Sequence, residues 1–135
     1  MKLYAHPFSS FCQKALIAFY ENDIAFEYRT LEDPSANAEL LALWPLKRFP
    51  VLQDGETTVL ESSSIIEYLQ AYYPGPVRLI PDDAAAAIEV RMRDRVFDNY
   101  VSTPQGRIVF NSMRAEADRD PLGDAEAPSL TTSTR

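Results

Sequence analysis

LYAHPFSSFC, residues 3–12, has the pattern of a short apolar strand that turns directly into a helix. Pro7 marks the turn, and the four residues from Ser9 to Cys12 have the pattern of a helix start. The first N–H groups of a helix have no partner within the helix, and the peptide dipoles add partial positive charge there. The hydroxyl of Ser9 or Ser10 would lie beside these donors, so the junction predicts a place for an anion. An ordinary N-cap is the simpler interpretation of either serine taken alone.

The residues that follow extend this junction into a strand–helix–strand unit. The helical stripe is headed by Cys12 and ends near Asn22-Asp23, after which apolar and polar residues alternate over 24–29 as in a half-buried strand. Such a crossover joins parallel strands and packs its helix on the sheet. Cys12 is therefore predicted to be a small core residue, because a reactive thiol needs exposure and a lowered pKa.

Residues 34–73 add a helix, a hairpin and another helix. Pro45 must end the helix that begins after Pro34, because proline cannot continue it. Asp54-Gly55 between two apolar runs is typical of a tight antiparallel hairpin. A third helix opens within 61–64, so the predicted order is βαβαββα, complete by about residue 73.

Composition excludes several classes of partner and site. The formal net charge of −7 disfavours binding to nucleic acid or to an anionic membrane, so a small ligand fits better. A single cysteine allows no intrachain disulfide, and no secretory pattern follows Met1, so we expect a cytoplasmic protein. His6 is the only histidine and has no cluster of ligands around it, so no metal site is expected.

In combination, these motifs resemble the thioredoxin-fold N-terminal domain of cytosolic glutathione S-transferases. The resemblance rests on the order of the elements together with Ser9 to Cys12, Phe49-Pro50-Val51 and Glu61-Ser62. It covers residues 1–80 and continues into the next helix. No single motif is decisive, but their order and spacing are far more specific than any one of them.

The resemblance implies that Ser9 activates the thiol of glutathione, with Ser10 as the alternative. Ser9 would donate a hydrogen bond to the thiolate and would not itself lose a proton. The turn also resembles the Cys-Pro-Phe-Cys turn of glutaredoxins, with Ser9 in place of the attacking cysteine. A serine hydroxyl cannot replace that thiolate, so dithiol exchange is not expected. Serine at this position points loosely to the serine-using classes, including the zeta-like isomerases.

The glutathione-binding residues implied by the resemblance are Lys47, Arg48, Phe49, Pro50, Val51, Glu61 and Ser62. In the family, the proline matching Pro50 is cis, and the next residue pairs its backbone with the cysteinyl part of glutathione. Glu61 would face the γ-glutamyl ammonium and Ser62 the adjacent carboxylate, although the serines at 62–64 compete for the helix cap. Lys47 or Arg48 would meet the glycyl carboxylate, or both are solvated loop charges. Glutathione is thus expected as co-substrate, without a metal.

The second part of the chain is expected to be a truncated helical domain. A stiff linker, held by Leu79 and Ile80, leads into a helical segment over 81–114 that Pro104 bends or breaks. Residues 115–135 are polar and acidic and are expected to be a poorly ordered tail. Inward-facing positions expected on the long helix are Ile88, Met92 and Val96.

Two functions are compatible with these observations. The first is a transferase-like enzyme that adds the glutathione thiolate to a small electrophile or uses it in an isomerisation. The alternative is a non-catalytic thioredoxin-fold module that binds glutathione or a protein, and the missing helices favour it. In the family, the helical domain lines the electrophile site and contributes to the dimer, so a homodimer is the expected state.

Overall fold

The computed structural model describes residues 1–132, with side chains through residue 127, and divides into two compact units, Met1–Asp82 and Asp83–Arg135. The elements of the first unit are β1 (Lys2–Ala5), α1 (Ser10–Glu21), β2 (Glu27–Thr30), α2 (Pro34–Leu43), β3 (Val51–Asp54), β4 (Thr57–Leu60) and α3 (Ser62–Tyr72). The strand order is β2-β1-β3-β4; β1 and β2 are parallel, and the other pairs are antiparallel. The predicted thioredoxin-like βαβαββα fold is confirmed.

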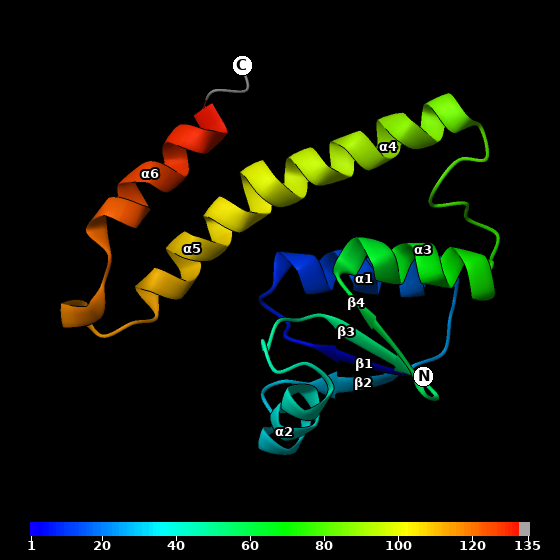
Figure 1. Ribbon diagram of the computed structural model, residues 1–135, viewed down its shortest axis with the longest axis horizontal. Helices are drawn as coiled ribbons and strands as arrows, with labels where there is room; N and C mark the ends of the chain where they lie inside the picture. The colour runs from blue at the N-terminus through cyan, green and yellow to red at the C-terminus, as the bar shows by residue number, and fades with distance from the viewer. Residues whose placement is uncertain (133–135) are drawn as a thin grey trace. The chain divides into compact units, whose positions relative to one another are not determined.

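Two apolar layers enclose the sheet, with α1 and α3 on one face and α2 on the other (Figure 1). Successive residues of a strand point to opposite faces, so Leu3 and Ala5 pack with α1 and α3 while Tyr4 packs with α2. Leu52 and Val51 of β3 divide between the layers in the same way. The central strands β1 and β3 are therefore buried on both faces.

The α2 layer contains a charged network that ties α2 to β1 and β2. Tyr4 Oη donates to Glu39 Oε2 at 2.8 Å, and Arg29 donates to both carboxylate oxygens of Glu39, at 2.6 and 3.2 Å. Burial, followed by the hydrogen bond to Glu39, raises the pKa of Tyr4 to about 12. The hydrogen bonds from Arg29 and Tyr4 lower the pKa of Glu39. This network holds α2 in place, and with it the start of the loop that leads to β3.

Two reciprocal pairs of hydrogen bonds hold the linker after α3. Asn22 Nδ2 donates to the Val77 carbonyl at 3.0 Å, and the Val77 N–H donates to Asn22 Oδ1 at 2.8 Å. Gln70 makes the same exchange with the backbone of Ile80, at 2.9 and 2.8 Å. Leu79 packs against the core and Ile80 is buried, so their predicted role in holding the linker is confirmed.

Gly75→Ala is expected to lower the free energy of unfolding of the first unit. The added Cβ would lie 2.4 Å from Asn22 Oδ1 and 2.6 Å from Asn22 Cβ, so the linker must move and its two bonds to Asn22 are lost. The expected loss is about 1–2 kcal/mol. Urea unfolding followed by the fluorescence of Trp44, the only tryptophan, measures this.

Gly106→Ala is the matched control, because nothing lies within 4 Å of its added Cβ. Gly106 lies in the second unit, so this variant should have the same urea midpoint, measured by Trp44 fluorescence, as the unsubstituted chain. A Gly75→Ala midpoint that coincides with that of the control would show that the close approach to Asn22 does not matter.

The second unit consists of helices. Its elements are α4 (Ala84–Phe97), the π-helical η1 (Asp98–Ser102), α5 (Thr103–Ser112), the short 3-10 helix η2 (Glu116–Asp118) and α6 (Pro121–Thr132). Pro104 does not break the chain's helical path, because the wider turn of η1 precedes it and the ribbon continues from α4 into α5 (Figure 1). Thr103 Oγ1 donates to the Asp98 carbonyl at 2.7 Å across this turn. Among the described residues, no helix is both long and apolar enough to cross a membrane.

The segment after residue 115 differs from the expected poorly ordered tail, because it contains η2 and α6. Asn111 organises it: its Nδ2 donates to the Asp120 carbonyl at 3.0 Å, and its Oδ1 accepts the Asp120 N–H at 2.8 Å. Asp120 Oδ1 in turn accepts the N–H groups of Leu122 and Gly123, at 3.1 and 3.0 Å, as a helix cap does. The last three residues of the expected tail, 133–135, lie outside the described residues.

The predicted inward face of α4 is exposed instead. Ile88 and Met92 have 67% and 56% of their surface exposed, and Val96 has 36%. The reason lies in the packing of the unit, since α6 packs mainly against α5 and η1. Within the described part of the second unit, an apolar face on α4 is therefore uncovered.

Candidate functional site

The register of the sheet brings three distant motifs to one edge. Tyr4 of β1 is paired with Val51 of β3, and Val51 is paired with Leu60 of β4. The end of β1 and the end of β4 therefore lie on either side of the start of β3, where α1 and α3 also begin (Figure 1). Each of these strand ends adjoins one motif: the turn with Ser9 follows β1, Pro50 precedes β3, and Glu61-Ser62 follows β4. The three motifs therefore lie around the same edge of the sheet.

His6 connects two of these motifs. Its ring lies 6.2 Å from that of Phe49 and 5.6 Å from that of Phe8, centroid to centroid. His6 Nδ1 accepts the Phe8 N–H at 3.2 Å, and its carbonyl accepts the Ser9 N–H at 3.1 Å. His6 is a loop residue, as predicted, but it also shapes the turn that carries Ser9 and contacts the loop that carries Pro50.

Ser9 is the N-cap residue of α1, and its Oγ accepts the Cys12 N–H at 3.3 Å. A hydroxyl has one proton to donate and two lone pairs, so this cap uses a lone pair and not the proton. Ser9 is half-buried, whereas Ser10 is exposed as the first residue of α1. Of the two serines, Ser9 is the one whose side chain is held at the helix start.

Cys12 is a core residue and not a nucleophile. Its side chain is fully buried, and its sulfur accepts the His6 N–H at 3.4 Å. Burial raises the pKa of the Cys12 thiol, and the smaller opposing effects of its hydrogen bonds do not reverse this. The prediction of a small core residue is confirmed.

The Phe49–Pro50 peptide bond is cis, as the family resemblance implied. Pro50 is buried, and Val51 begins β3 with no exposed surface. Lys47 and Arg48 are both exposed in the loop before this bond. The Lys47 N–H donates to the Trp44 carbonyl at 2.9 Å, which ties this loop to the end of α2.

Glu61 and Ser62 form the start of α3. Glu61 is the N-cap residue, but its side chain makes no cap hydrogen bond, so its exposed carboxylate has no part in starting the helix. Ser62 is the first helical residue and only 2% exposed. The helix therefore starts at Ser62, within the range 61–64 that the sequence predicted.

Backbone strain coincides with these motifs. In the described part of the chain, three non-glycine residues have positive φ, and two of them are Lys47 (φ 55°) and Glu61 (φ 69°). Such conformations cost about 1–3 kcal/mol each and are concentrated at functional sites. This edge thus combines two helix starts, an exposed carboxylate and two loop cations, a set suited to a small ligand that carries carboxylates and an ammonium.

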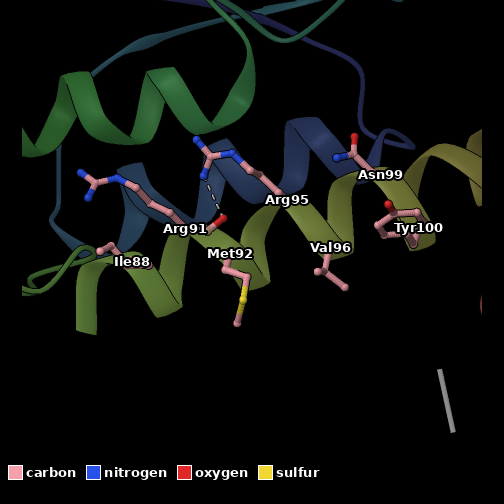
Figure 2. A pocket seen from close by; sticks show the side chains of 7 residues that line it. All are labelled: Ile88, Arg91, Met92, Arg95, Val96, Asn99 and Tyr100. Carbon is pink, nitrogen blue, oxygen red and sulfur yellow. Dashed lines mark hydrogen bonds between the residues drawn. The ribbon is translucent and has the colours of Figure 1, made fainter. Parts of the chain in front are cut away.

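A shallow hollow of about 430 Å³ lies along α4 and η1 in the second unit. Figure 2 shows Arg91 and Arg95 extending to one side of α4 and Met92 and Val96 to the other, with Arg95 Nη1 donating to the Arg91 carbonyl at 3.0 Å. None of the residues predicted for the glutathione site lines it.

Comparisons with known proteins agree on one family. The model of the glutathione S-transferase N-terminal domain matches residues 3–77. A probable maleylacetoacetate isomerase of Vibrio cholerae is 35% identical over 94 residues, which cover 66% of this chain and 43% of that protein. Human glutathione S-transferase theta-1 is 32% identical over 93 residues, 67% of this chain and 39% of the relative.

The same likeness extends to solved structures. A glutathione S-transferase of Methylobacillus flagellatus KT, solved with GSH bound, is similar at a TM-score of 0.79 and 28% identity, covering 98% of this chain and 65% of that one. The chain spans less than half the length of the two relatives above, at 43% and 39%.

Proposed function

The chain belongs to the glutathione S-transferase family, and on this basis we propose that it binds glutathione at the edge where β1, β3 and β4 meet α1 and α3. The observation that carries the proposal is the convergence of Ser9, cis Pro50 and Glu61-Ser62 at this edge. The solved relative with GSH bound supports glutathione as the ligand.

In the proposed complex each motif receives one part of the tripeptide. Val51 pairs its backbone with the cysteinyl residue, as an added strand would. The γ-glutamyl ammonium faces Glu61, and its carboxylate lies at the start of α3 beside Ser62. Lys47 or Arg48 meets the glycyl carboxylate at the exposed end of the site.

The proposed chemistry begins with ionisation of the glutathione thiol, whose proton leaves to solvent. Ser9 Oγ donates a hydrogen bond to the sulfur, which stabilises the thiolate over the thiol. The thiolate then attacks an electrophilic carbon, and the displaced electron pair moves to the leaving group or into the substrate's conjugated system. Similarity to a probable maleylacetoacetate isomerase supports isomerisation as well as conjugation.

A non-catalytic glutathione-binding module is the second candidate. A binding module needs only the first unit, Met1–Asp82, which contains every residue proposed to bind glutathione. Conjugation of glutathione to an activated aryl halide separates the candidates. The enzyme proposal predicts turnover that saturates with glutathione, whereas saturable binding without turnover would establish the binding module.

We place the protein in the cytoplasm. Thiol-dependent chemistry needs glutathione in its reduced form, which the cytosol maintains. The free, buried state of Cys12, the chain's only cysteine, is compatible with that compartment.

We further propose that the chain forms a homodimer through the exposed apolar face of α4 and η1. Exposed apolar residues on these helices include Ile88, Met92, Phe97 and Tyr100, with 67%, 56%, 60% and 52% of their surface uncovered. A face of this kind favours self-association. Sedimentation equilibrium should give a dimer for the unsubstituted chain and a monomer for Met92→Glu. Arg93→Glu, which changes charge but removes no apolar surface, is the control and should remain dimeric; a strictly monomeric unsubstituted chain would contradict the proposal.

A further inference from the structure

The side chain of His6 lies at the turn between β1 and α1, and no step of the proposed chemistry uses it. The backbone of this turn is held by three hydrogen bonds. The His6 N–H donates to Cys12 Sγ at 3.4 Å, the Cys12 N–H donates to Ser9 Oγ at 3.3 Å, and the Ser9 N–H donates to the His6 carbonyl at 3.1 Å. These bonds form a closed circuit around the Ser9 hydroxyl, and the circuit does not involve the imidazole ring.

The imidazole fixes the middle of the turn, Pro7-Phe8, which lies outside this circuit. Pro7 has no N–H to donate, and its carbonyl accepts a bond of 2.7 Å from Gln13 Nε2. Phe8 is 83% exposed, so packing contributes little to holding it. Its N–H donates to His6 Nδ1 at 3.2 Å, which is the way an asparagine side chain fixes a turn two residues further on. The residue directly before Ser9 is therefore held by the imidazole.

The same ring contacts the loop that carries cis Pro50. Its centroid lies 6.2 Å from that of Phe49, which is half-buried and packs against both apolar layers of the sheet. His6 thus connects the turn that carries Ser9 with the loop that leads into Val51.

We propose that His6 is a positioning residue that, through its bond to Phe8, keeps Ser9 Oγ within reach of the sulfur of a glutathione bound along Val51. This inference rests on the proposed function, in which Val51 places the cysteinyl residue and Ser9 stabilises the thiolate. A displacement of about 1 Å can cost roughly a hundredfold in rate, so the geometry of the turn affects the chemistry more than ligand binding. His6 acts through Ser9 and exchanges no proton with the ligand.

The test applies three measurements to the full chain. They are the pKa of the bound glutathione thiol, read from the ultraviolet absorbance of the thiolate; kcat and KM for conjugation; and the exchange rate of the Ser9 N–H without ligand. His6→Ala should raise the pKa of the bound thiol and lower kcat roughly tenfold, while the KM for glutathione stays within about twofold. Exchange of the Ser9 N–H should be faster in this variant.

Two further variants separate the hydrogen bond from the ring. His6→Asn places an amide oxygen where Nδ1 accepts, without the ring, and should restore most of kcat and the lower thiol pKa. His6→Phe keeps a ring beside Phe49 but has no acceptor, so it should behave like His6→Ala. Gln70→Ala removes both bonds to Ile80 in the linker and is the control for a loss of stability. It should leave the pKa of the bound thiol as in the unsubstituted chain.

A purely structural role for His6 predicts a different pattern. His6→Ala would then lower the free energy of unfolding, as Gln70→Ala does, and leave kcat and the pKa of the bound thiol unchanged. That result overturns the inference while leaving the glutathione site intact, and so do equal values for His6→Asn and His6→Phe. The thiol pKa is read without turnover, so the test also applies to a chain that only binds glutathione. Absence of glutathione binding to the unsubstituted chain would instead overturn the proposed function, and the role of His6 with it.

Discussion

Replacing Ser9 with alanine is expected to lower kcat for conjugation well over tenfold and to leave the KM for glutathione nearly unchanged. Ser9 Oγ is held at the start of α1, and its hydrogen bond is made chiefly to the thiolate, so its loss affects the transition state more than ligand binding. Lowering a thiol pKa from about 8.5 to about 6.5 requires roughly 2.7 kcal/mol. A hydrogen bond to an anion contributes about 1.5–3 kcal/mol and a helix start about 0.3–1 kcal/mol. The two together suffice without a histidine base.

The controls must separate chemistry from folding. Ser9→Ala also removes the cap bond to the Cys12 N–H, at a cost of about 1 kcal/mol in stability, so unfolding is measured beside turnover. Ser9→Asp retains a capping acceptor but has no proton to donate to the thiolate, and it should be as inactive as Ser9→Ala. Ser10→Ala changes an exposed serine and should remain active. If Ser9→Ala and the unsubstituted chain turn over equally, the thiol is activated by Ser10 or by neither serine.

Glu61→Ala is expected to weaken glutathione binding by about 2–3 kcal/mol, or roughly 30- to 150-fold. The substitution leaves the ligand ammonium without a charged partner where the γ-glutamyl group is bound. The Glu61 side chain makes no cap hydrogen bond, and alanine meets the same strain at φ 69°, so stability should change little. Calorimetric titration with glutathione, together with urea unfolding, measures both quantities.

Glu61→Gly sharpens this prediction because glycine tolerates positive φ. The strain of about 1 kcal/mol or more should be relieved, so the variant should unfold at higher urea but still bind glutathione as weakly as Glu61→Ala. Glu56→Ala removes another exposed carboxylate, in the turn between β3 and β4, and should bind normally. Normal binding by both Glu61 variants would remove Glu61 from the site.

Local signals were sufficient to predict the fold of the first unit. Pro34 and Pro45 bracket α2, Asp54-Gly55 makes the turn between β3 and β4, and alternating residues mark the strands. Each of these depends on the backbone preferences of a few neighbouring residues. The convergence of the site did not follow from such signals, because it depends on the strand register, and it was implied by family resemblance alone.

Contacts between distant residues explain what the sequence did not reveal. The bond between Lys14 and Ser63 joins residues 49 positions apart, and the exchange between Asn22 and Val77 joins residues 55 apart. Composition predicted a poorly ordered segment where Asn111 in fact binds the backbone of Asp120, whose side chain caps the start of α6. In each case a polar side chain binds a partner outside its own helix, at separations from 9 to 55 positions, and no local pattern encodes the partner.

The central claim is that glutathione binds where β1, β3 and β4 meet α1 and α3. It is tested most directly by recording amide NMR spectra of the full, ¹⁵N-labelled chain during titration with glutathione. The account predicts saturable shifts, with one dissociation constant, for the amides of Ser9–Cys12, Val51 and Ser62–Ser64, and none along the hollow of α4. Spectra that do not change, or saturable shifts confined to the residues around Arg91 and Arg95, would contradict it.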